Sequence, residues 1–429
     1  MRILVTGANG LIGSAVCARL RQEGHEIVAA VRPGSRPVPQ AAAAVIEIDL
    51  AQAVDHKAWL PCLASVAAVV NCVGALQDGA QESVAEAHVA AAATLFRACE
   101  QAGVRRVIHF SAIGVDREQP SAFSATKLEG DRFLMERDLE WIILRPSVVL
   151  GRAVFGASAL FRGLAALPIL PEMKNTGALQ VVQLDDVVTT VAFFVHPDAP
   201  SRLALELAGP EQLSMSDVVA HYRNWFGWRS ARRVIIPDFL SGLLYRAGDA
   251  AGWLGWRAPV RSTARREMVR GAVGDPTPWI TATKIEPLPL GEALARQPVS
   301  VQERWFAKLY FLKPLIFLVL PFFWIATGVI SVTIGFDDGL ELMRRAGVDA
   351  LAAPGVVAGA IADMIVGAAI AYRPLARLGL FGAIALCLFY TVAGTILLPE
   401  LWNEPLGPLM KILPIFVLHL VALAILKER

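Results

Sequence analysis

The sequence has few charged residues and lacks any cysteine pattern typical of disulfides or metal sites. Charged residues make up 18% of the 429 positions and hydrophobic residues 55%, whereas an average soluble protein is about one quarter charged. The five cysteines form no CxxC pair and no metal-ligand spacing with histidine. Reduced thiols, no metal and a cytosolic compartment are therefore expected. The net charge of +2 is too small to favour nucleic acid as a partner.

A secretory signal is also lacking, because the short apolar start at residues 1–13 already contains a strand and a glycine turn. The first half is therefore expected to stay in the cytosol. The shortage of charge lies almost entirely after Pro314, so the long chain is expected to contain several domains. We predict a nucleotide-binding domain at 1–210, a basic, tryptophan-rich, membrane-proximal segment at 211–313 and a transmembrane domain at 314–429.

A glycine-rich turn stands between a short strand, Ile3–Val5, and a helix that begins at Leu11. A strand, a glycine turn and a helix in this order are typical of dinucleotide-binding domains. The first glycine permits the tight turn, the second lets the backbone approach a pyrophosphate, and the third lets helix and strand pack closely. The helix amides near its start then face the phosphates. The predicted cofactor-binding residues of this turn are Gly7, Asn9, Gly10, Leu11, Ile12 and Gly13.

Further strands are predicted at 27–31, 45–48, 67–72 and 107–110, with helical stretches between several of them. This alternation predicts an α/β fold with a doubly wound parallel Rossmann sheet, whose ligand lies at the carboxyl ends of the strands. Arg32 follows the second strand, where an acidic residue would hold the ribose of NAD; an arginine suits a 2′-phosphate, so NADP(H) is favoured over NAD(H). The other residues expected at strand ends are Asp49, Leu50, Val73, Gly74 and Ser111.

Together these features resemble the atypical and extended short-chain dehydrogenase/reductase superfamily. The motifs that carry the resemblance are TGANGLIG at 6–13, DL at 49–50, NCVG at 71–74, HFSAIG at 109–114 and LRPSVVLG at 144–151. The resemblance implies a dinucleotide under the strand ends and Ser111 near a substrate carbonyl. It also implies cofactor contacts from Pro146, and a Tyr-x-x-x-Lys pair on the next helix.

The sequence departs from that pattern at the tyrosine. Lys127 is present, but Phe123 occupies the tyrosine position. Carbonyl reduction needs a proton donor, and a phenol beside an ammonium has a lowered pKa; phenylalanine has no proton to give. Ser111 and Lys127 remain the candidate catalytic residues, and Lys127 is able to hold the nicotinamide ribose without any chemistry. Asp186 is expected to cap a helix rather than to catalyse.

Arginine and tryptophan alternate between residues 211 and 313. Such a segment suits either base stacking on nucleic acid or docking on anionic lipid head groups. Because the chain enters a membrane soon afterwards, lipid is the predicted partner and nucleic acid is not; an ordinary solvated face is the alternative. The tryptophans concerned are Trp225, Trp228, Trp253, Trp256, Trp279 and Trp305, and the arginines are Arg223, Arg229, Arg232, Arg233, Arg257, Arg261, Arg265, Arg266 and Arg270.

Four apolar stretches follow, at 315–335, 350–372, 378–398 and 412–426, and predict an all-α, four-helix transmembrane domain. Basic residues lie before the first stretch, between the second and third, and after the fourth, so they fall on one side of the membrane. They are Lys308, Lys313, Arg373, Arg377, Lys427 and Arg429. The positive-inside rule then places the nucleotide domain and the C-terminus in the cytoplasm, with the helices in the cell (inner) membrane. Asp363 in the second span is a functional candidate, and His419 in the last span is a possible partner for it.

The last third resembles the DoxX-like family of small four-helix membrane domains, in FFW at 322–324, LLPELW at 397–402 and GPLMKILP at 407–414. The whole chain resembles bacterial fusions of a short-chain dehydrogenase-like domain with a DoxX-like domain. Part of the first half also resembles the nucleotide-binding accessory subunit of respiratory complex I, in which the cofactor is held without turnover.

Two hypotheses follow from the sequence. The first is an NADP(H)-linked oxidoreductase or epimerase relative that acts on a lipophilic small molecule, with atypical or lost tyrosine-based catalysis. The second is a non-catalytic nucleotide-binding module of a membrane redox complex, with a membrane-protein partner or a second copy of the chain. A third, weaker interpretation makes the DoxX-like half the redox or transport element and the nucleotide half its regulator.

Overall fold

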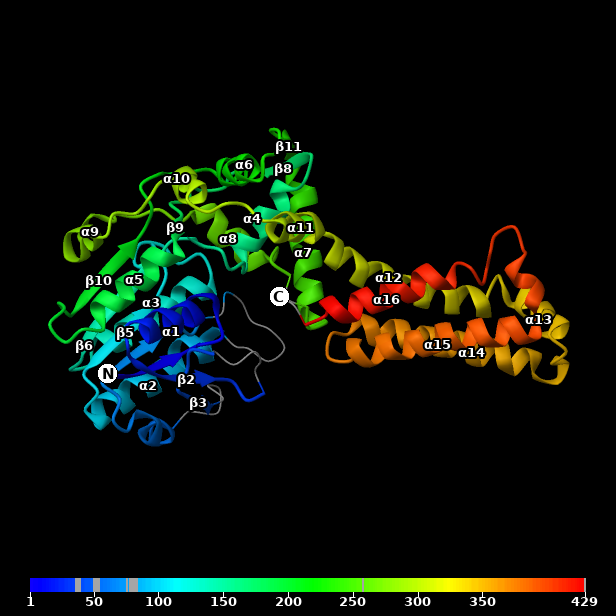
Figure 1. The fold of residues 1–429 in the computed structure, drawn as a ribbon, viewed down its shortest axis with the longest axis horizontal. Helices are drawn as coiled ribbons and strands as arrows, with labels where there is room; N and C mark the ends of the chain where they lie inside the picture. Colours follow the sequence, from blue (N-terminus) through cyan, green and yellow to red (C-terminus); the bar gives the residue numbers. More distant parts are fainter. Residues whose placement is uncertain (35–39, 49–54, 75, 77–83, 257, 428–429) are drawn as a thin grey trace. The chain divides into compact units, whose positions relative to one another are not determined.

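The computed structural model describes residues 1–34, 40–48, 55–74, 76, 84–256 and 258–427 (Figure 1). The chain divides into two compact units. The first comprises Met1–Ala250 and Arg257–Ala307, and the second comprises Ala251–Trp256 and Lys308–Arg429. The division therefore differs from the three parts expected at 1–210, 211–313 and 314–429, because most of the middle segment folds with the first unit.

The first unit is built on a parallel sheet of seven strands in the order β10-β6-β5-β4-β1-β2-β3. This is the predicted doubly wound Rossmann sheet, in which the strand order reverses beside β1. The strands are β1 (Arg2–Thr6), β2 (Glu26–Val31), β3 (Ala44–Glu47), β4 (Ala68–Asn71), β5 (Arg106–Phe110), β6 (Glu140–Pro146) and β10 (Leu203–Leu207).

Alternate side chains of each strand enter different cores, as the period of two in a strand requires. On β1, Ile3 and Val5 join the core under α1 (Leu11–Gln22) and α5 (Leu184–Phe194), while Leu4 joins the core under α2 (Ala91–Ala102). Figure 1 shows these helices on the two faces of the sheet. The second core also receives α3 (Ala122–Met135) and the short turns η1 (His56–Ala58) and η2 (Leu60–Leu63); α2 is preceded by η3 (Glu86–Ala90).

The rest of the first unit adds two pairs of short parallel strands and several helices. The paired strands are β7 (Val149–Leu150) with β9 (Val182–Gln183), and β8 (Ile169–Met173) with β11 (Arg232–Ile236). The helices are α4 (Ala157–Ala165), α6 (Met215–Phe226), α7 (Asp238–Trp253), α8 (Ser262–Arg270), α9 (Thr277–Thr283), α10 (Leu290–Ala295) and α11 (Val301–Leu309). The last residues of α7 and α11 belong to the second unit.

Several aromatic and basic residues of the middle segment serve the fold. Trp279 is fully buried in the sheet core and donates its indole N–H to Thr190. Trp228 stacks on Phe226 with ring centroids 4.5 Å apart. Arg223 is buried and donates to the backbone carbonyls of Ala165 and Leu167. The expectation that all the tryptophans and arginines of 211–313 form a lipid-docking surface is therefore wrong for Trp279 and Arg223, because long-range packing has buried both side chains.

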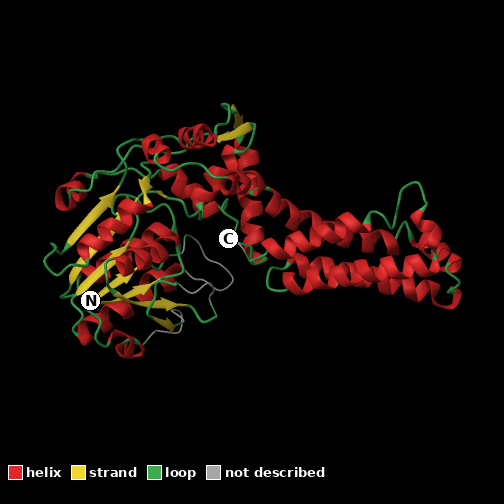
Figure 2. Cartoon of the chain, in the orientation of Figure 1, coloured by secondary structure: helices red, strands yellow, loops and turns green. Residues whose placement is uncertain are grey.

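The second unit consists of helices joined by short turns and loops (Figure 2). The helices are α12 (Leu312–Val332), α13 (Phe336–Arg345), α14 (Ala352–Ala371), α15 (Ala376–Leu397) and α16 (Ile412–Ile425), with short turns η4 (Asp349–Leu351) and η5 (Pro399–Trp402). All of the longer helices except α13 are apolar. Among the described residues, the stretches 301–332, 349–371 and 376–397 are long and apolar enough to cross a membrane. The fourth expected span is the shorter α16, whose 14 residues extend about 21 Å.

Asp363 and His419, two ionisable side chains inside this unit, have separate partners. Tyr390 donates to Asp363 at 2.9 Å, whereas His419 accepts from the indole of Trp324 at 2.9 Å. The other ring nitrogen of His419 lies 2.6 Å from the carbonyl of Ile415, which only accepts. His419 is therefore a neutral, Nδ1-protonated ring with both nitrogens engaged. Asp363 and His419, for which the sequence left a pairing open, therefore do not bond to each other.

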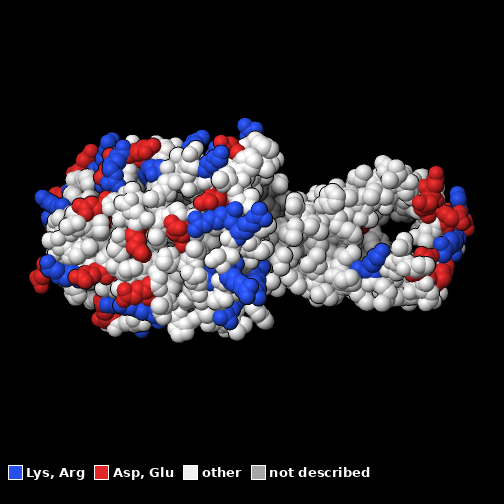
Figure 3. Space-filling view, turned by 90° about the horizontal axis from the view of Figure 1, so that it is seen from above, with Lys and Arg blue, Asp and Glu red and all other residues white. Residues whose placement is uncertain are grey.

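Charged side chains gather at the end of this unit that carries α13 (Figure 3). Arg345 lies 3.2 Å from Glu400 and 3.4 Å from Glu404. Its positive charge is thus offset by carboxylates of the loop after α15. This pairing accounts for the presence of Arg345 on the side expected to be acidic.

Candidate nucleotide-binding site

The glycine turn joins β1 to α1 and is closed by a hydrogen bond from the N–H of Gly10 to the carbonyl of Gly7, at 2.9 Å. Gly7 has φ +64°, and a Cβ there would lie 2.8 Å from the backbone of Cys72 at the end of β4. A side chain is therefore excluded both by conformation and by space. Gly10 caps α1 in extended backbone, which leaves the first N–H groups of the helix available to an anion.

The turn also holds α1 close and leaves one polar side chain unsatisfied. A Cβ on Gly13 would lie 2.2 Å from the carbonyl oxygen of Gly7, so the predicted close packing at this glycine is present. Both amide atoms of Asn9 are buried and have no hydrogen-bond partner among the described residues. Buried polar atoms are almost always paired. The Asn9 amide is thus a fitting contact for the polar groups of a dinucleotide.

Lys127 on α3 bonds to the backbone at the carboxyl ends of β4 and β5. Its ammonium donates to the carbonyl of Phe110 at 2.7 Å and to that of Val73 at 3.1 Å. Burial lowers the pKa of Lys127 to about 8, although Asp131 opposes the shift. A Cβ on Gly74 would lie 3.4 Å from the Lys127 nitrogen. The small residue expected at position 74 therefore leaves room beside the nitrogen of the buried Lys127.

Phe123 lies one helical turn before Lys127, and its ring meets that of His88 edge-on, with centroids 5.6 Å apart. The Thr126 hydroxyl donates to the carbonyl of Ala122, so it accepts from Nδ1 of His88 at 2.9 Å. Burial, together with the charge of Lys127, lowers the pKa of His88 to about 2. Neither Phe123 nor the neutral imidazole therefore replaces the missing phenol as a proton donor.

Ser111 follows β5 and donates to Asp131 at 2.9 Å. Two nitrogens of Arg145 bind the same carboxylate oxygen at 3.0 and 3.1 Å, and all three side chains are buried. Burial raises the pKa of Asp131, while Arg145 and the Ser111 hydrogen bond act in the opposite direction. The Ser111 proton is thus committed to Asp131, and its oxygen is left only as an acceptor.

A second buried chain of polar groups runs beneath this site. Thr6 donates to Asn71 at 2.7 Å, and the Asn71 amide lies 3.0 Å from Nδ1 of His109. Burial lowers the pKa of His109 well below its usual value. The network links β1, β4 and β5, and so fixes the strand ends relative to one another. Asp131, Arg145 and His109 were missed from the sequence; the spacing of Asp131 four residues after Lys127 was the available signal.

The other predicted residues occupy the same edge of the sheet where they are described. Arg32 is exposed and follows β2 directly. Pro146 ends β6, and its carbonyl accepts from the N–H of Ile113 at 3.2 Å. The predicted contacts Asp49 and Leu50 lie outside the described residues. Asp186 is in the first turn of α5, but it does not cap the helix: the capping position is Gln183.

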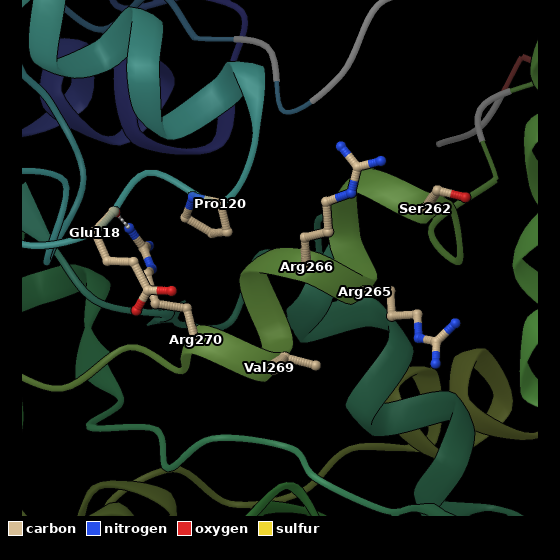
Figure 4. Close-up of a pocket in the computed structure, with 7 residues that line it drawn as sticks. All are labelled: Glu118, Pro120, Ser262, Arg265, Arg266, Val269 and Arg270. Carbon is tan, nitrogen blue, oxygen red and sulfur yellow. Dashed lines mark hydrogen bonds between the residues drawn. The ribbon is translucent and has the colours of Figure 1, made fainter. Parts of the chain in front are cut away.

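A cavity of about 360 Å³ lies beside the loop that leads into α3 (Figure 4). Arg270 reaches the carbonyl of Glu118 at 3.2 Å and pairs with Glu267 at 2.8 Å, whereas Arg265 and Arg266 extend away and are exposed. The cavity is therefore basic and open. Its lining residues are Glu118, Pro120, Ser262, Arg265, Arg266, Val269 and Arg270.

Comparisons with known families match both units. Residues 7–153 match an NAD(P)H-binding family, and residues 321–420 match the DoxX-like family. The N-terminal unit therefore carries an NAD(P)-binding domain for a nicotinamide cofactor, and the helices of the C-terminal unit form a DoxX-like membrane domain. The predicted NAD(P)-binding domain and the predicted DoxX-like domain are thus confirmed.

Three curated relatives each align with about half of this chain. An uncharacterized protein of Mycobacterium tuberculosis is 28% identical over 222 residues, which cover 51% of this chain and 23% of that protein. The chain thus spans about a quarter of that relative's length. The 3-diazoavenalumate denitrifying reductase of a Streptomyces species is 28% identical over 53% of this chain and 82% of its own. The 2-alkyl-3-oxoalkanoate reductase of Stenotrophomonas maltophilia is 29% identical over 42% of this chain and 58% of its own.

Solved structures show the same fold. MoeE5 in complex with UDP-glucose and NAD has a TM-score of 0.54 and 22% identity, and covers 69% of this chain and 97% of its own. The UDP-glucuronic acid 4-epimerase of Bacillus cereus, in complex with UDP-glucuronic acid and NAD, has a TM-score of 0.53 and 18% identity, and covers 72% of this chain and all of its own. This fold extends well beyond residue 210, in agreement with the folding of the middle segment onto the first unit.

Proposed function

We propose that this NAD(P)-binding chain with a DoxX-like membrane domain is an NADP(H)-linked oxidoreductase that acts on a lipophilic substrate without a catalytic tyrosine. The proposal rests chiefly on Lys127, whose ammonium bonds to carbonyls at the ends of β4 and β5, beside an intact glycine turn. These two hydrogen bonds leave one of its three N–H groups for a ligand. When bound, a reduced nicotinamide supplies hydride.

Reduction of a carbonyl by hydride also needs a proton donor, and few of the described side chains at this site are able to supply the proton. Ser111 is committed to Asp131, and Phe123 carries no proton. Lys127, with its pKa lowered to about 8, exists partly as an ammonium and partly as a free amine near neutral pH. A group with such a pKa is suited to proton transfer. Lys127 therefore both holds the nicotinamide ribose and supplies the proton.

The preference for NADP(H) rests on Arg32. It is exposed directly after β2, the position at which an arginine accommodates a 2′-phosphate. We expect Arg32→Ala to weaken NADPH binding about tenfold while leaving NADH binding unchanged, since a charge-assisted bidentate pair is lost. Arg21→Ala, at an exposed arginine of α1, is the matched control. Equal affinities of the wild-type protein for the two cofactors would refute the preference.

A second candidate function is cofactor binding without turnover. It is favoured because Phe123 has no proton to donate and because the Ser111 hydroxyl already donates to Asp131. The two functions are separated by NADPH oxidation with a panel of lipophilic carbonyl compounds in the full-length protein. We expect turnover in the wild type, a loss of at least about tenfold in Lys127→Met, and a gain in Phe123→Tyr, as expected for restored general-acid catalysis. Phe155→Tyr is the control, because it makes the same substitution at an exposed phenylalanine outside α3.

Absence of turnover in both the wild type and Phe123→Tyr, with NADPH still bound tightly, would instead establish the binding module. Turnover that survives in Lys127→Met would show that the proton comes from elsewhere.

The membrane topology is a separate proposal. With α16 as the fourth span, both the N-terminal unit and the C-terminus lie in the cytoplasm, because Lys308, Arg373 and Lys427 are on one side. Reporter fusions at the C-terminus and in the 400–407 loop test this arrangement. Activity of a periplasm-dependent reporter is expected in the loop only; the same activity at the C-terminus would indicate three spans.

A further inference from the structure

Helix α7 turns its large apolar side chains outward. Phe239, Leu243, Leu244 and Leu240 are 73%, 64%, 46% and 45% exposed. The opposite face, which points into the protein, carries Ser241, Tyr245 and Gly248, all buried. This is the reverse of the pattern of a helix on a water-soluble protein, in which the apolar stripe faces the core.

The contacts of the inner face prevent the helix from rolling to hide these side chains. A Cβ on Gly248 would lie 1.7 Å from the carbonyl oxygen of Val260, so backbone packs directly against the helix. Tyr245 donates to the sulfur of Met173 at 2.9 Å. Asp249 accepts from the N–H of Ser262 at 3.2 Å and pairs with Arg261 at 3.3 Å. The apolar face is therefore a fixed surface.

The chain that follows α7 is attached to the membrane helices. Residues 251–256 belong to the second unit. Trp256 packs on Phe317 of α12 with centroids 4.6 Å apart, and its indole donates to the carbonyl of Ala371 at the end of α14, at 2.7 Å. The N–H of Arg373 donates to Leu254 at 2.9 Å. The C-terminal end of α7 is thus fixed where α12 begins and α14 ends.

The length of α7 limits how far its apolar face can lie from the membrane helices. The 16 residues of α7 span about 24 Å, and the helix continues directly into residues 251–256 of the second unit. Trp253, the last residue of α7, is 85% exposed, and tryptophan is enriched at the membrane–water interface. The neighbouring strand β11 adds Ile235, which is 57% exposed.

The polar rim of this face is basic. Arg246 on α7 and Arg265 and Arg266 on α8 are exposed. The guanidinium of Arg265 lies 5.7 Å from the ring centre of Tyr245, which places it beside the helix. Asp249, by contrast, is paired with Arg261. An apolar helical face bordered by arginines matches a bilayer surface with anionic head groups.

We propose that α7 is an interfacial membrane helix: Phe239, Leu240, Leu243 and Leu244 insert into a lipid leaflet, with anionic lipid head groups against Arg246, Arg265 and Arg266. This role does not depend on the nucleotide chemistry. The sequence predicted lipid contact by the tryptophans of 211–313. In this proposal the contact is made instead by α7, whose exposed apolar residues are mainly leucine and phenylalanine.

The test uses the full chain in lipid nanodiscs, with the five cysteines replaced by alanine and an environment-sensitive fluorophore on Leu243→Cys. Val45→Cys on β3 is the matched control, because Val45 is an apolar residue with 41% exposure in the same unit. Lipids with spin labels high in the acyl chain are expected to quench the fluorophore at 243 at least about twofold more than at 45. Equal quenching at the two sites would overturn the proposal.

Two other occupants give different results. A second copy of the chain, or the helices of the second unit, would shield the fluorophore at 243 from water without quenching by labelled lipid, which overturns the proposal. The head-group contact is tested by Arg246→Glu combined with Arg266→Glu in nanodiscs that contain phosphatidylglycerol. Quenching is expected to fall by about half, while Arg21→Glu leaves it unchanged; no fall would overturn the head-group contact.

Should the cysteine-free chain fail to fold, the unmodified chain offers a second readout. A photoreactive phospholipid in nanodiscs is expected to cross-link the segment 238–250, identified by mass spectrometry. Labelling of the spans 312–332 and 376–397 without any in 238–250 would overturn the proposal.

Discussion

Replacing Gly13 by alanine tests whether the contact between α1 and the glycine turn is what makes the cofactor site. In most helices this change stabilises, because alanine has the higher helix propensity by about 1 kcal/mol. Here the added Cβ would lie 2.2 Å from the carbonyl oxygen of Gly7, about 1.2 Å short of ordinary van der Waals contact, and 3.0 Å from Cα of Ala8. These neighbours are backbone atoms and have no rotamer to change, so α1 itself must move.

Overpacking of this kind costs about 1–3 kcal/mol, which outweighs the gain in propensity and lowers the melting temperature of the first unit by roughly 5 °C. The larger effect is on the cofactor. The first N–H groups of α1 are displaced from Gly7 by about 1 Å, and misplacement on this scale weakens a positioned contact by about an order of magnitude or more. We expect NADPH affinity to fall at least about tenfold.

The assay is titration of the full-length protein with NADPH, followed by cofactor fluorescence, together with thermal unfolding. Gly24→Ala is the control: Gly24 has φ +84° but no atom within 4 Å of an added Cβ. It is expected to lose about 1 kcal/mol of stability and no affinity. A Gly13→Ala protein with unchanged melting and unchanged affinity would refute the role assigned to this contact.

Three further predictions concern ionisable and buried groups. Burial and Asp185 raise the pKa of Asp186 to about 6. A raised carboxyl pKa lowers the free energy of unfolding as pH rises through about 4 to 6. In thermal unfolding, Asp186→Asn should therefore stabilise the protein by about 1 kcal/mol at pH 8, allowing for solvent screening, and by less at pH 4. The pKa of Lys127 is lowered to about 8, so NADPH affinity should fall as pH rises from 7 to 9, a dependence absent in Lys127→Met. Trp324→Phe leaves His419 without its buried donor and should cost about 1–3 kcal/mol in detergent unfolding. Trp402→Phe is the control and should cost less, because the half-buried Trp402 donates to Thr395 in a hydrogen bond that is exposed.

The sequence predicted the nucleotide fold because its signals are local. The strand before Gly7, the helix after Gly10 and the alternating apolar runs each depend on neighbours within a few residues. β1 and β2 were therefore predicted to within one residue at each end. The need for glycine at position 13 is also local, because a side chain there would meet the backbone of Gly7, six residues earlier. The spacing of the glycine motif therefore predicts this contact as well.

The polar network of the site was not predictable in the same way. Ser111, Asp131 and Arg145 come from β5, α3 and β6, and their meeting depends on how those elements pack. For the same reason, composition alone placed Trp279 on a lipid surface, although it fills the sheet core. Periodicity also misses α7, because its apolar stripe looks alike whether it faces a protein core or a bilayer.

The division of the chain has a consequence for experiments that cut it. The backbone passes between the two units three times, at residues 250–251, 256–257 and 307–308. A single protease cut near residue 307 would therefore leave the strap 251–256 on the N-terminal fragment, where only its non-covalent contacts, such as those of Trp256 with Phe317 and Ala371, hold residues 308–429. A fragment that stops before α12 would keep this strap but lose Phe317 and Ala371, the partners of Trp256. Such a fragment would expose a large indole and aggregate, so the nucleotide-binding unit is best isolated with the strap deleted and residue 250 rejoined to 257.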